Sequence, residues 1–282
     1  MPIEHISDTA RWVAFYRAME TERGDAIFHD PFARRLAGPR GEEIVRTIPR
    51  GRSTAWAMIV RTAVFDEIIA SVTARGVDTV INLAAGLDAR PWRLALPAAL
   101  HWVDVDLPAI LHYKTETLAQ ETPRCRYEAI TADLTDDAAR RALFERLGAG
   151  AKRSLILSEG LLIYLTAEQV GALARDLHAQ PGFAWWLIDL ASPWLLQYMN
   201  RSWGRQVAAG NAPFQFAPAE STAFFEPFGW REAEFRSSID EARRLHRDMP
   251  LGWLWRFLSR LGPKARQEEM RRMSGIVLLE RV

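Results

Sequence analysis

Apolar residues follow a helical spacing in the first quarter of the chain and a strand spacing after it. An early stripe of large apolar residues recurs every three or four positions: Trp12, Phe15, Tyr16 and Met19. A second stripe predicts a longer helix over residues 53–75, which Gly76 ends. These patterns predict an N-terminal helical cap over residues 1–76.

Five apolar runs follow the cap, and helical patterns lie between most of them. The runs predict strands over residues 79–84, 102–105, 126–131, 154–157 and 183–190. Thr166 and Gln169 form a capping box at the start of one of the intervening helices. This alternation predicts a mostly parallel sheet with helices on both faces, in a core of residues 77–190.

The alternation then ends. Residues 191–228 are rich in aromatic side chains and contain four prolines, which predicts a lid-like insertion rather than a linker. Two more strands are expected over residues 230–235 and 276–282, the last of them antiparallel to its neighbours. We therefore expect one α/β domain over residues 1–282, with seven strands, in which residues 229–282 hold the closing strands and a helical insertion.

The composition is that of an ordinary globular protein. Lys and Arg (36) balance Asp and Glu (35), so the net charge of +1 gives no general attraction to nucleic acid or to a membrane, and we expect neither partner. The single cysteine, Cys125, excludes an intrachain disulfide and indicates a reducing compartment. With no signal-peptide pattern and no apolar window long enough to span a bilayer, the expected location is cytoplasmic.

Tryptophan is frequent, and its positions are uneven. Seven of the eleven tryptophans follow residue 180. This bias predicts a large apolar pocket built from the C-terminal half, with plain core packing as the alternative. The six histidines lack the spacing of metal ligands, so we expect no metal site.

The stretch from Val80 to Leu94 predicts a buried strand, a turn of small residues and then an amphipathic helix. The strand after it ends in Asp106. A turn of this kind lets the backbone approach a ligand, and the acid can accept hydrogen bonds from ribose hydroxyls. Together they predict a nucleoside-binding half-site.

The residues of the turn favour one nucleoside cofactor over another. The turn has the form Ala84-x-Gly86-x-x-Ala89 and contains Asp88, which would repel a pyrophosphate. S-adenosylmethionine has no phosphate and is therefore favoured over NAD. No tyrosine is followed by a lysine four residues later, as a short-chain dehydrogenase requires.

Two further strand ends carry polar residues that fit the same cofactor. Asp133 follows the third strand, where it could hold the adenine amino group while Leu134 covers the ring. Glu159 follows the fourth strand, at the edge where open α/β sheets bind their ligands.

Six motifs lie in order between about residues 7 and 190. They are Thr9 to Glu20 with Asp30 to Ala33, Arg61 to Asp66, Leu83 to Leu94, Val103 to Pro108 with Lys114, Ala132 to Leu134, and Glu159 to Leu165. Together they resemble the leucine carboxyl methyltransferase-like family, which includes enzymes that esterify the C-terminal leucine of a phosphatase and bacterial polyketide carboxyl O-methyltransferases. The resemblance implies a Rossmann-like class I methyltransferase fold and S-adenosyl-L-methionine as cofactor.

The resemblance also implies roles for single residues. Arg61 pairs with the methionine carboxylate of the cofactor, and Glu159 lies near its amino group. Ala84 and Gly86 bring the backbone close to the ligand, although the first family glycine is an alanine here. Asp106 binds the ribose, with Asp104 as the weaker candidate. The adenine is framed by Asp133 and Leu134.

These observations predict an O-methyltransferase that works by in-line displacement on a carboxylate or a phenol of a small molecule such as a polyketide; a protein C-terminus stays open as acceptor. No catalytic residue is identified, because an ionised carboxylate needs no strong base. Five aromatic residues are candidate walls of the acceptor pocket: Trp194, Tyr198, Trp203, Phe214 and Phe216. Two alternatives stay open, a NAD(P)-dependent Rossmann oxidoreductase and a non-catalytic protein that binds S-adenosylmethionine.

Overall fold

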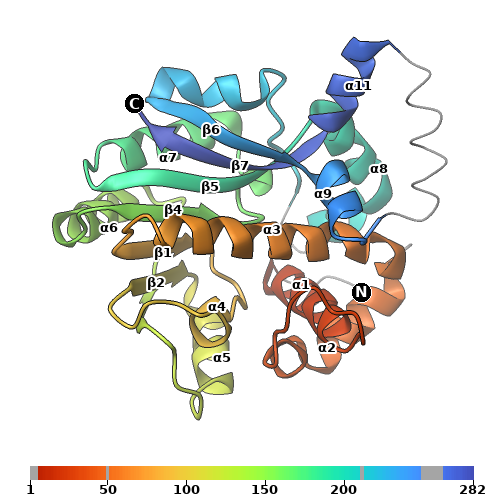
Figure 1. Ribbon diagram of the computed structural model, residues 1–282, viewed down its shortest axis with the longest axis horizontal. Helices are drawn as coiled ribbons and strands as arrows, with labels where there is room; N and C mark the ends of the chain where they lie inside the picture. Colours follow the sequence, from red (N-terminus) through yellow and green to blue (C-terminus); the bar gives the residue numbers. More distant parts are fainter. Residues whose placement is uncertain (1–5, 49–50, 210–212, 249–262) are drawn as a thin grey trace.

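A seven-stranded sheet forms the centre of the protein (Figure 1). The computed structural model describes residues 6–48, 51–209, 213–248 and 263–282. The strands are β1 (Thr79–Leu83), β2 (His101–Asp106), β3 (Arg126–Thr131), β4 (Ser154–Ser158), β5 (Phe183–Ala191), β6 (Trp230–Ser237) and β7 (Ser274–Arg281). Their order in the sheet is β3-β2-β1-β4-β5-β7-β6. The first five pair in parallel, and β7 is antiparallel to both of its neighbours. The predicted mostly parallel, Rossmann-like sheet is confirmed.

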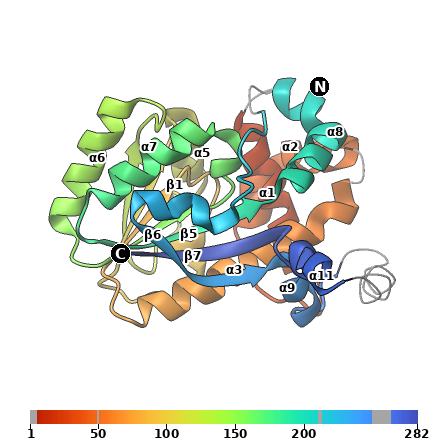
Figure 2. The same cartoon turned by 90° about the horizontal axis from the view of Figure 1, so that it is seen from above.

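Helices cover both faces of this sheet (Figure 2). One face packs against α6 (Asp137–Gly150), α7 (Ala167–His178) and the 3₁₀ helix η3 (Ser221–Phe228). The other face packs against α3 (Ala55–Thr73) and α9 (Ser238–Arg244). The predicted capping box of α7 is confirmed at Thr166 and Gln169, and the carboxylate of Asp136 accepts from two backbone N–H groups in the first turn of α6.

The N-terminal helices form a third packed group. α1 (Ile6–Thr21) and α2 (Ala33–Thr47) share an apolar core with the start of α3 and with α5 (Pro108–Thr117). The 3₁₀ helix η1 (Gly51–Thr54) leads into α3. The long apolar stripe of α3 thus has two functions, because one end packs with the cap and the remainder packs on the sheet.

The helix predicted after the glycine turn forms, but it is short. Only one turn forms there, α4 (Arg90–Arg93), and Leu94 is already extended with a ψ of 149°. Pro97 follows closely and opposes the helical conformation in the residue before it. The short α4 turns the side chains of Arg90 and Arg93 toward α3, where both bind Asp66.

The C-terminal tryptophans divide between the two predicted uses. Trp186 and Trp230 are fully buried in the core, and Trp185 is nearly so. Trp194 and Trp203 belong to α8 (Pro193–Ala209), in the aromatic segment after β5, and line a cavity described below. Two others, Trp253 and Trp255, lie outside the described residues.

The alternation of side chains along β5 determines the face of the sheet to which its one acidic residue, Asp189, points. Trp186, Ile188 and Leu190 face the core formed with α6 and α7. Trp185 and Leu187 face the core formed with α3. Since strand side chains alternate between faces, Asp189 continues the second row and points toward α3.

Candidate functional site

A cavity of about 2780 Å³ opens at the carboxyl ends of the parallel strands. It exceeds the roughly 300–1,000 Å³ of common ligand pockets, so a cofactor and a second molecule fit together. Every residue predicted to bind the cofactor lines this cavity: Arg61, Ala84, Gly86, Asp106, Asp133, Leu134 and Glu159. The structure therefore brings all the predicted positions to one place, although they come from α3 and from the ends of four strands.

The small-residue turn after β1 adopts a left-handed backbone. Ala84 has a φ of 53° and Gly86 a φ of 52°. A Cβ atom on Gly86 would lie 3.3 Å from the Cβ of Ala10, so α1 packs directly on this turn. The left-handed conformation turns the chain sharply, and Ala84, Ala85 and Gly86 line the cavity.

Asp106 is fixed by the backbone of the turn and of its own strand end. Gly86 N donates to Oδ2 at 2.6 Å, and Leu107 N donates to Oδ1 at 2.7 Å. Burial raises the pKa of Asp106, and the two backbone hydrogen bonds partly oppose that rise. Each carboxylate oxygen keeps a second lone pair for a donor in the cavity.

Asp104, the weaker ribose candidate, has a different position. Its side chain is fully buried and accepts from Lys114 Nζ at 2.6 Å, Tyr127 Oη at 2.8 Å and Trp102 Nε1 at 2.9 Å. Burial and the Asp104 charge raise the pKa of Tyr127. Asp104 does not line the cavity. It holds β2, β3 and α5 together, and of the two aspartates only Asp106 lines the cavity.

Asp88 lines the cavity, but its charge is compensated by neighbouring groups. Its carboxylate accepts from Arg90 Nη1 at 2.8 Å, Arg90 N at 2.9 Å and Asn82 Nδ2 at 3.1 Å. Burial alone would raise the pKa of Asp88, but the charges of Arg90 and Lys114 pull it well below its ordinary value. Because Arg90 compensates this charge, Asp88 would repel a pyrophosphate less strongly than the sequence of the turn suggested.

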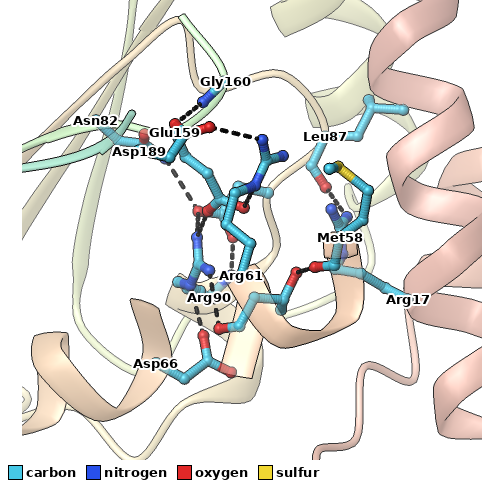
Figure 3. A network of polar contacts seen from close by, with 12 residues as sticks. Arg17, Met58, Arg61, Asp66, Asn82, Leu87, Arg90, Glu159, Gly160 and Asp189 are labelled. Carbon is cyan, nitrogen blue, oxygen red and sulfur yellow. Dashed lines mark hydrogen bonds and ion pairs between the residues drawn. The ribbon is translucent and has the colours of Figure 1, made fainter. Parts of the chain in front are cut away.

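Arg61 lies in a network of ion pairs at the inner end of the cavity (Figure 3). Its Nε donates to Glu159 Oε1 at 3.0 Å, and its Nη1 donates to Asp189 Oδ2 at 3.1 Å. The other oxygen of Glu159 accepts from Arg90 Nη1 at 2.7 Å. Burial opposes the charge of Arg61, but Asp189 and then Glu159 raise its pKa above the ordinary value.

Gly160 lets this network close. Its φ of 67° is left-handed, and a Cβ atom there would lie 3.0 Å from Arg61 Nη1. Its backbone N–H donates to Asp189 Oδ1 at 2.6 Å. Asp189 was missed from the sequence, although a signal was present, because it is the one charged residue in the apolar strand Phe183–Ala191.

Asp133 and Leu134 lie at the end of β3, on the opposite side of the turn from Arg61. Thr135 donates to Asp133 Oδ1 through its backbone N at 2.9 Å and its hydroxyl at 2.6 Å. These bonds lower the pKa of Asp133 and keep it ionised. Leu134 packs against the core, so an apolar surface and a fixed acceptor lie side by side.

The outer part of the cavity is aromatic. All five expected wall residues line it: Trp194, Tyr198, Trp203, Phe214 and Phe216. The rings of Trp194 and Tyr198 stack in parallel at 6.0 Å, and both are exposed, by 62% and 39%. Tyr198 meets Trp203 edge to face at 6.4 Å, and Trp203 meets Trp12 of α1 at 6.3 Å. This row of rings runs from the mouth of the cavity to the N-terminal cap.

Within the described ranges of the chain, no group of three or more His, Cys, Asp or Glu side chains could hold a metal ion. None of the helices in that part of the chain is long and apolar enough to cross a membrane.

Comparison with known proteins gives one family. The leucine carboxyl methyltransferase family matches residues 10–178. A proposed S-adenosyl-L-methionine-dependent methyltransferase of Parafrankia sp. is 37% identical over 185 residues, which are 61% of this chain and 58% of that protein. One of Streptomyces coelicolor is 37% identical over 184 residues, 61% of this chain and 64% of that protein. The chain thus spans about three fifths of the length of these relatives.

Solved structures with a similar fold have much lower sequence identity. A DUF574 family protein from Streptomyces avermitilis superposes with a TM-score of 0.61 at 14% identity, over 97% of both chains. A methyltransferase proposed for Thermobifida fusca superposes with a TM-score of 0.58 at 14% identity, over 100% of this chain and 96% of that one. At this identity the likeness concerns the fold alone.

Proposed function

The chain belongs to the leucine carboxyl methyltransferase family, and we propose on that basis that it transfers the methyl group of S-adenosyl-L-methionine to an oxygen of a small molecule. The observation that supports this function best is the convergence of all seven predicted cofactor residues on one cavity with room for a second ligand. The acceptor oxygen belongs to a carboxylate or a phenol. The cavity is large enough for a small molecule such as a polyketide.

The residues at the inner end fit this cofactor. Asp106 has spare lone pairs for the two ribose hydroxyls, and the left-handed turn at Ala84 and Gly86 brings the backbone close to them. Asp133 and Leu134 offer an acceptor and an apolar surface to the adenine. Arg61 binds the methionine carboxylate, because a guanidinium suits that group. Glu159 holds Arg61 and Arg90 in place.

The bound cofactor supplies an electrophilic methyl group on a positively charged sulfur. The protein has to place an acceptor oxygen in line with that methyl group and exclude water. An ionised carboxylate needs no proton removed, so positioning supplies most of the rate. The aromatic row from Trp194 to Trp12 is the surface that would hold the body of such an acceptor.

Two measurements test the proposal. Calorimetric titration with S-adenosyl-L-methionine and with NADH separates a methyltransferase from a nicotinamide oxidoreductase. Binding of NADH alone would refute the methyltransferase function. The second measurement incubates the protein with S-adenosyl-L-methionine and a panel of carboxylic acids, phenols and peptides that end in leucine, and detects methylated product by mass spectrometry. Cofactor binding without any product would indicate a non-catalytic binding protein.

A further inference from the structure

Two aromatic rings lie at the junction between the inner end of the cavity and its aromatic outer part. They belong to Tyr164 of the 3₁₀ helix η2 (Leu162–Tyr164) and to Phe214, and their centroids lie 5.5 Å apart. On the inner side, burial raises the pKa of Tyr164 and the nearby charge of Arg61 opposes that rise. On the outer side, Phe214 packs in one apolar cluster with Trp203. An acceptor that lies on the aromatic row and points its reacting oxygen inward therefore passes this pair of rings.

The ring of Phe214 has little freedom to move away from such a ligand. It is only 7% exposed and packs against Ile44 of α2. The carbonyl of Phe214 accepts from Asn200 Nδ2 at 3.2 Å, and the backbone N of Gln215 donates to Ile163 O at 2.7 Å. Since side chains in a packed interior cannot shift without cost, this wall selects ligands by their shape.

The two rings are also held relative to each other. Gln215 Nε2 donates to Tyr164 O at 2.7 Å, and the planes of Tyr164 and Phe214 are inclined by 35°. Aromatic rings pack best against other flat, conjugated groups, offset or edge to face. A tetrahedral carbon beside the reacting oxygen projects its substituents out of the plane, so it cannot approach fixed rings as closely.

We propose that Phe214 is a specificity-determining residue that selects acceptors whose reacting oxygen is carried by a flat, conjugated group. This inference rests on the proposed function and narrows its acceptor. A C-terminal leucine is disfavoured, because its carboxylate is attached to a tetrahedral carbon with a branched side chain. Trp194 and Tyr198 are exposed, so they leave room for different substituents farther from the reacting oxygen. Phe214 lies beyond residues 10–178, so the family match does not determine this choice.

The test uses two probes with the same carbon skeleton and different planarity. They are 2-naphthoic acid and its fully saturated counterpart, decahydro-2-naphthoic acid, and both are ionised at neutral pH. Each is titrated calorimetrically into the full chain saturated with S-adenosyl-L-homocysteine. N-acetyl-L-leucine is the third probe and represents the branched acids. Burial of apolar area alone would favour the saturated acid, which is the more hydrophobic of the first two.

We expect the unmodified protein to bind 2-naphthoic acid roughly 5- to 50-fold more tightly than the saturated acid, the contribution of two aromatic contacts. N-acetyl-L-leucine should bind no more tightly than the saturated acid. Phe214→Leu and Phe214→Met keep an apolar side chain without the flat ring. Each should lower the ratio of the first two affinities by roughly three- to tenfold.

The matched control is Phe216→Leu, two residues farther along the same segment. Phe216 also lines the cavity and is 4% exposed, but its ring packs with Phe224 and Phe225 in the core on the sheet. This variant should change the affinities for the two naphthalene-type acids by the same factor and leave their ratio as it is. The ratio thus separates contact with the ligand from a general effect on packing.

Three results would overturn the assignment while the proposed function stands. They are equal affinities for the flat and saturated acids or tighter binding of N-acetyl-L-leucine, a ratio that both Phe214 variants retain or that Phe216→Leu also loses, and absence of binding of all three probes to protein that does bind S-adenosyl-L-homocysteine. Loss of affinity for S-adenosyl-L-homocysteine in both Phe214 variants would also overturn it, because Phe214 would then support the inner end. If the unmodified protein binds neither S-adenosyl-L-methionine nor S-adenosyl-L-homocysteine, the proposed function itself fails.

Discussion

The inner and outer parts of the cavity are built in opposite ways. The inner part consists of strand ends held by ion pairs, with Arg61, Arg90 and Glu159 bound to one another. The outer part contains aromatic rings, and those of α8 and α1 pack against one another. The inner part lies largely within the residues that match the family, and α8 lies beyond them. Charged side chains in fixed positions suit a ligand of constant structure such as a cofactor, whereas aromatic rings can pack against ligands of different shape.

The largest expected effect concerns the buried ion pair between Lys114 and Asp104, which lies behind the inner part of the cavity on β2, the strand that also carries Asp106. Lys114→Met leaves Asp104 charged and fully buried without its ion-pair partner. We expect a loss of about 3–5 kcal/mol in the free energy of unfolding, because the carboxylate of Asp104 would be left unpaired in the protein interior, which solvates a charge poorly. Urea denaturation followed by circular dichroism measures this loss.

Two controls sharpen the comparison. The double variant Asp104→Asn, Lys114→Met should recover much of the stability, since no buried charge remains. Trp194→Leu in the outer part should change the free energy of unfolding by no more than about 0.5 kcal/mol, because 62% of Trp194 is exposed. Equal losses in the Lys114 and Trp194 variants would show that the buried ion pair behind the inner part and the exposed ring of the outer part do not differ in their contribution to stability.

The next effect concerns affinity for the cofactor. Arg61→Ala removes the cation expected to bind the methionine carboxylate and leaves Glu159 and Asp189 with one fewer partner. Binding of S-adenosyl-L-homocysteine should weaken by about 1.5–3 kcal/mol, measured by calorimetry. Arg243→Ala, at the rim of the same cavity, is the matched control and should leave the affinity unchanged. An unchanged affinity in Arg61→Ala would remove Arg61 from the cofactor site.

The same division explains what the sequence could predict. Asp106, Glu159 and the turn at Gly86 follow buried strands directly, and the ends of parallel strands must meet at one edge of the sheet. Their convergence was therefore predictable from strand order alone. The pairing of Asp88 with Arg90 was not, because it depends on how a single short turn, α4, directs its side chains.

For the outer part, the sequence predicted which segment is aromatic but not how the rings contact one another. The aromatic richness after residue 190 indicated a pocket, and all five expected wall residues do line the cavity. Their partner Trp12 comes from the other end of the chain, and no local pattern connects it to Trp203. Asp189 was missed because it lies inside a strand. The apolar run Phe183–Ala191 predicted that strand as a whole, and its one charged residue was not considered separately.

A smaller effect should separate acceptor binding from cofactor binding. Tyr198→Leu removes a ring that contacts both Trp194 and Trp203. Once an acceptor is found, we expect its KM to rise by roughly three- to tenfold, the contribution of an aromatic contact beyond its area. The affinity for S-adenosyl-L-homocysteine should not change. A loss of cofactor affinity of the same size would show that the two parts of the cavity are not independent.

The smallest effect concerns Ala84, the alanine at the first glycine position of the turn. A left-handed backbone costs an L-residue about 1–2 kcal/mol, and Ala84 has a φ of 53°. Ala84→Gly removes that cost but adds about 0.4–1 kcal/mol of backbone entropy to the unfolded chain. We therefore expect a net gain of about 0.5–1 kcal/mol in the free energy of unfolding, measured by urea denaturation, with cofactor affinity retained because the turn acts through its backbone.

The matched control for that substitution lies in the same turn. Ala89 has a φ of −112° and is fully buried, so Ala89→Gly relieves no left-handed backbone and removes a packed methyl group. It should lower the free energy of unfolding by about 1 kcal/mol. Opposite signs at positions 84 and 89 would show that the inner part of the cavity tolerates backbone strain to shape its turn. A loss of stability in both variants would mean that Ala84 is accommodated without strain and that its methyl group contributes packing.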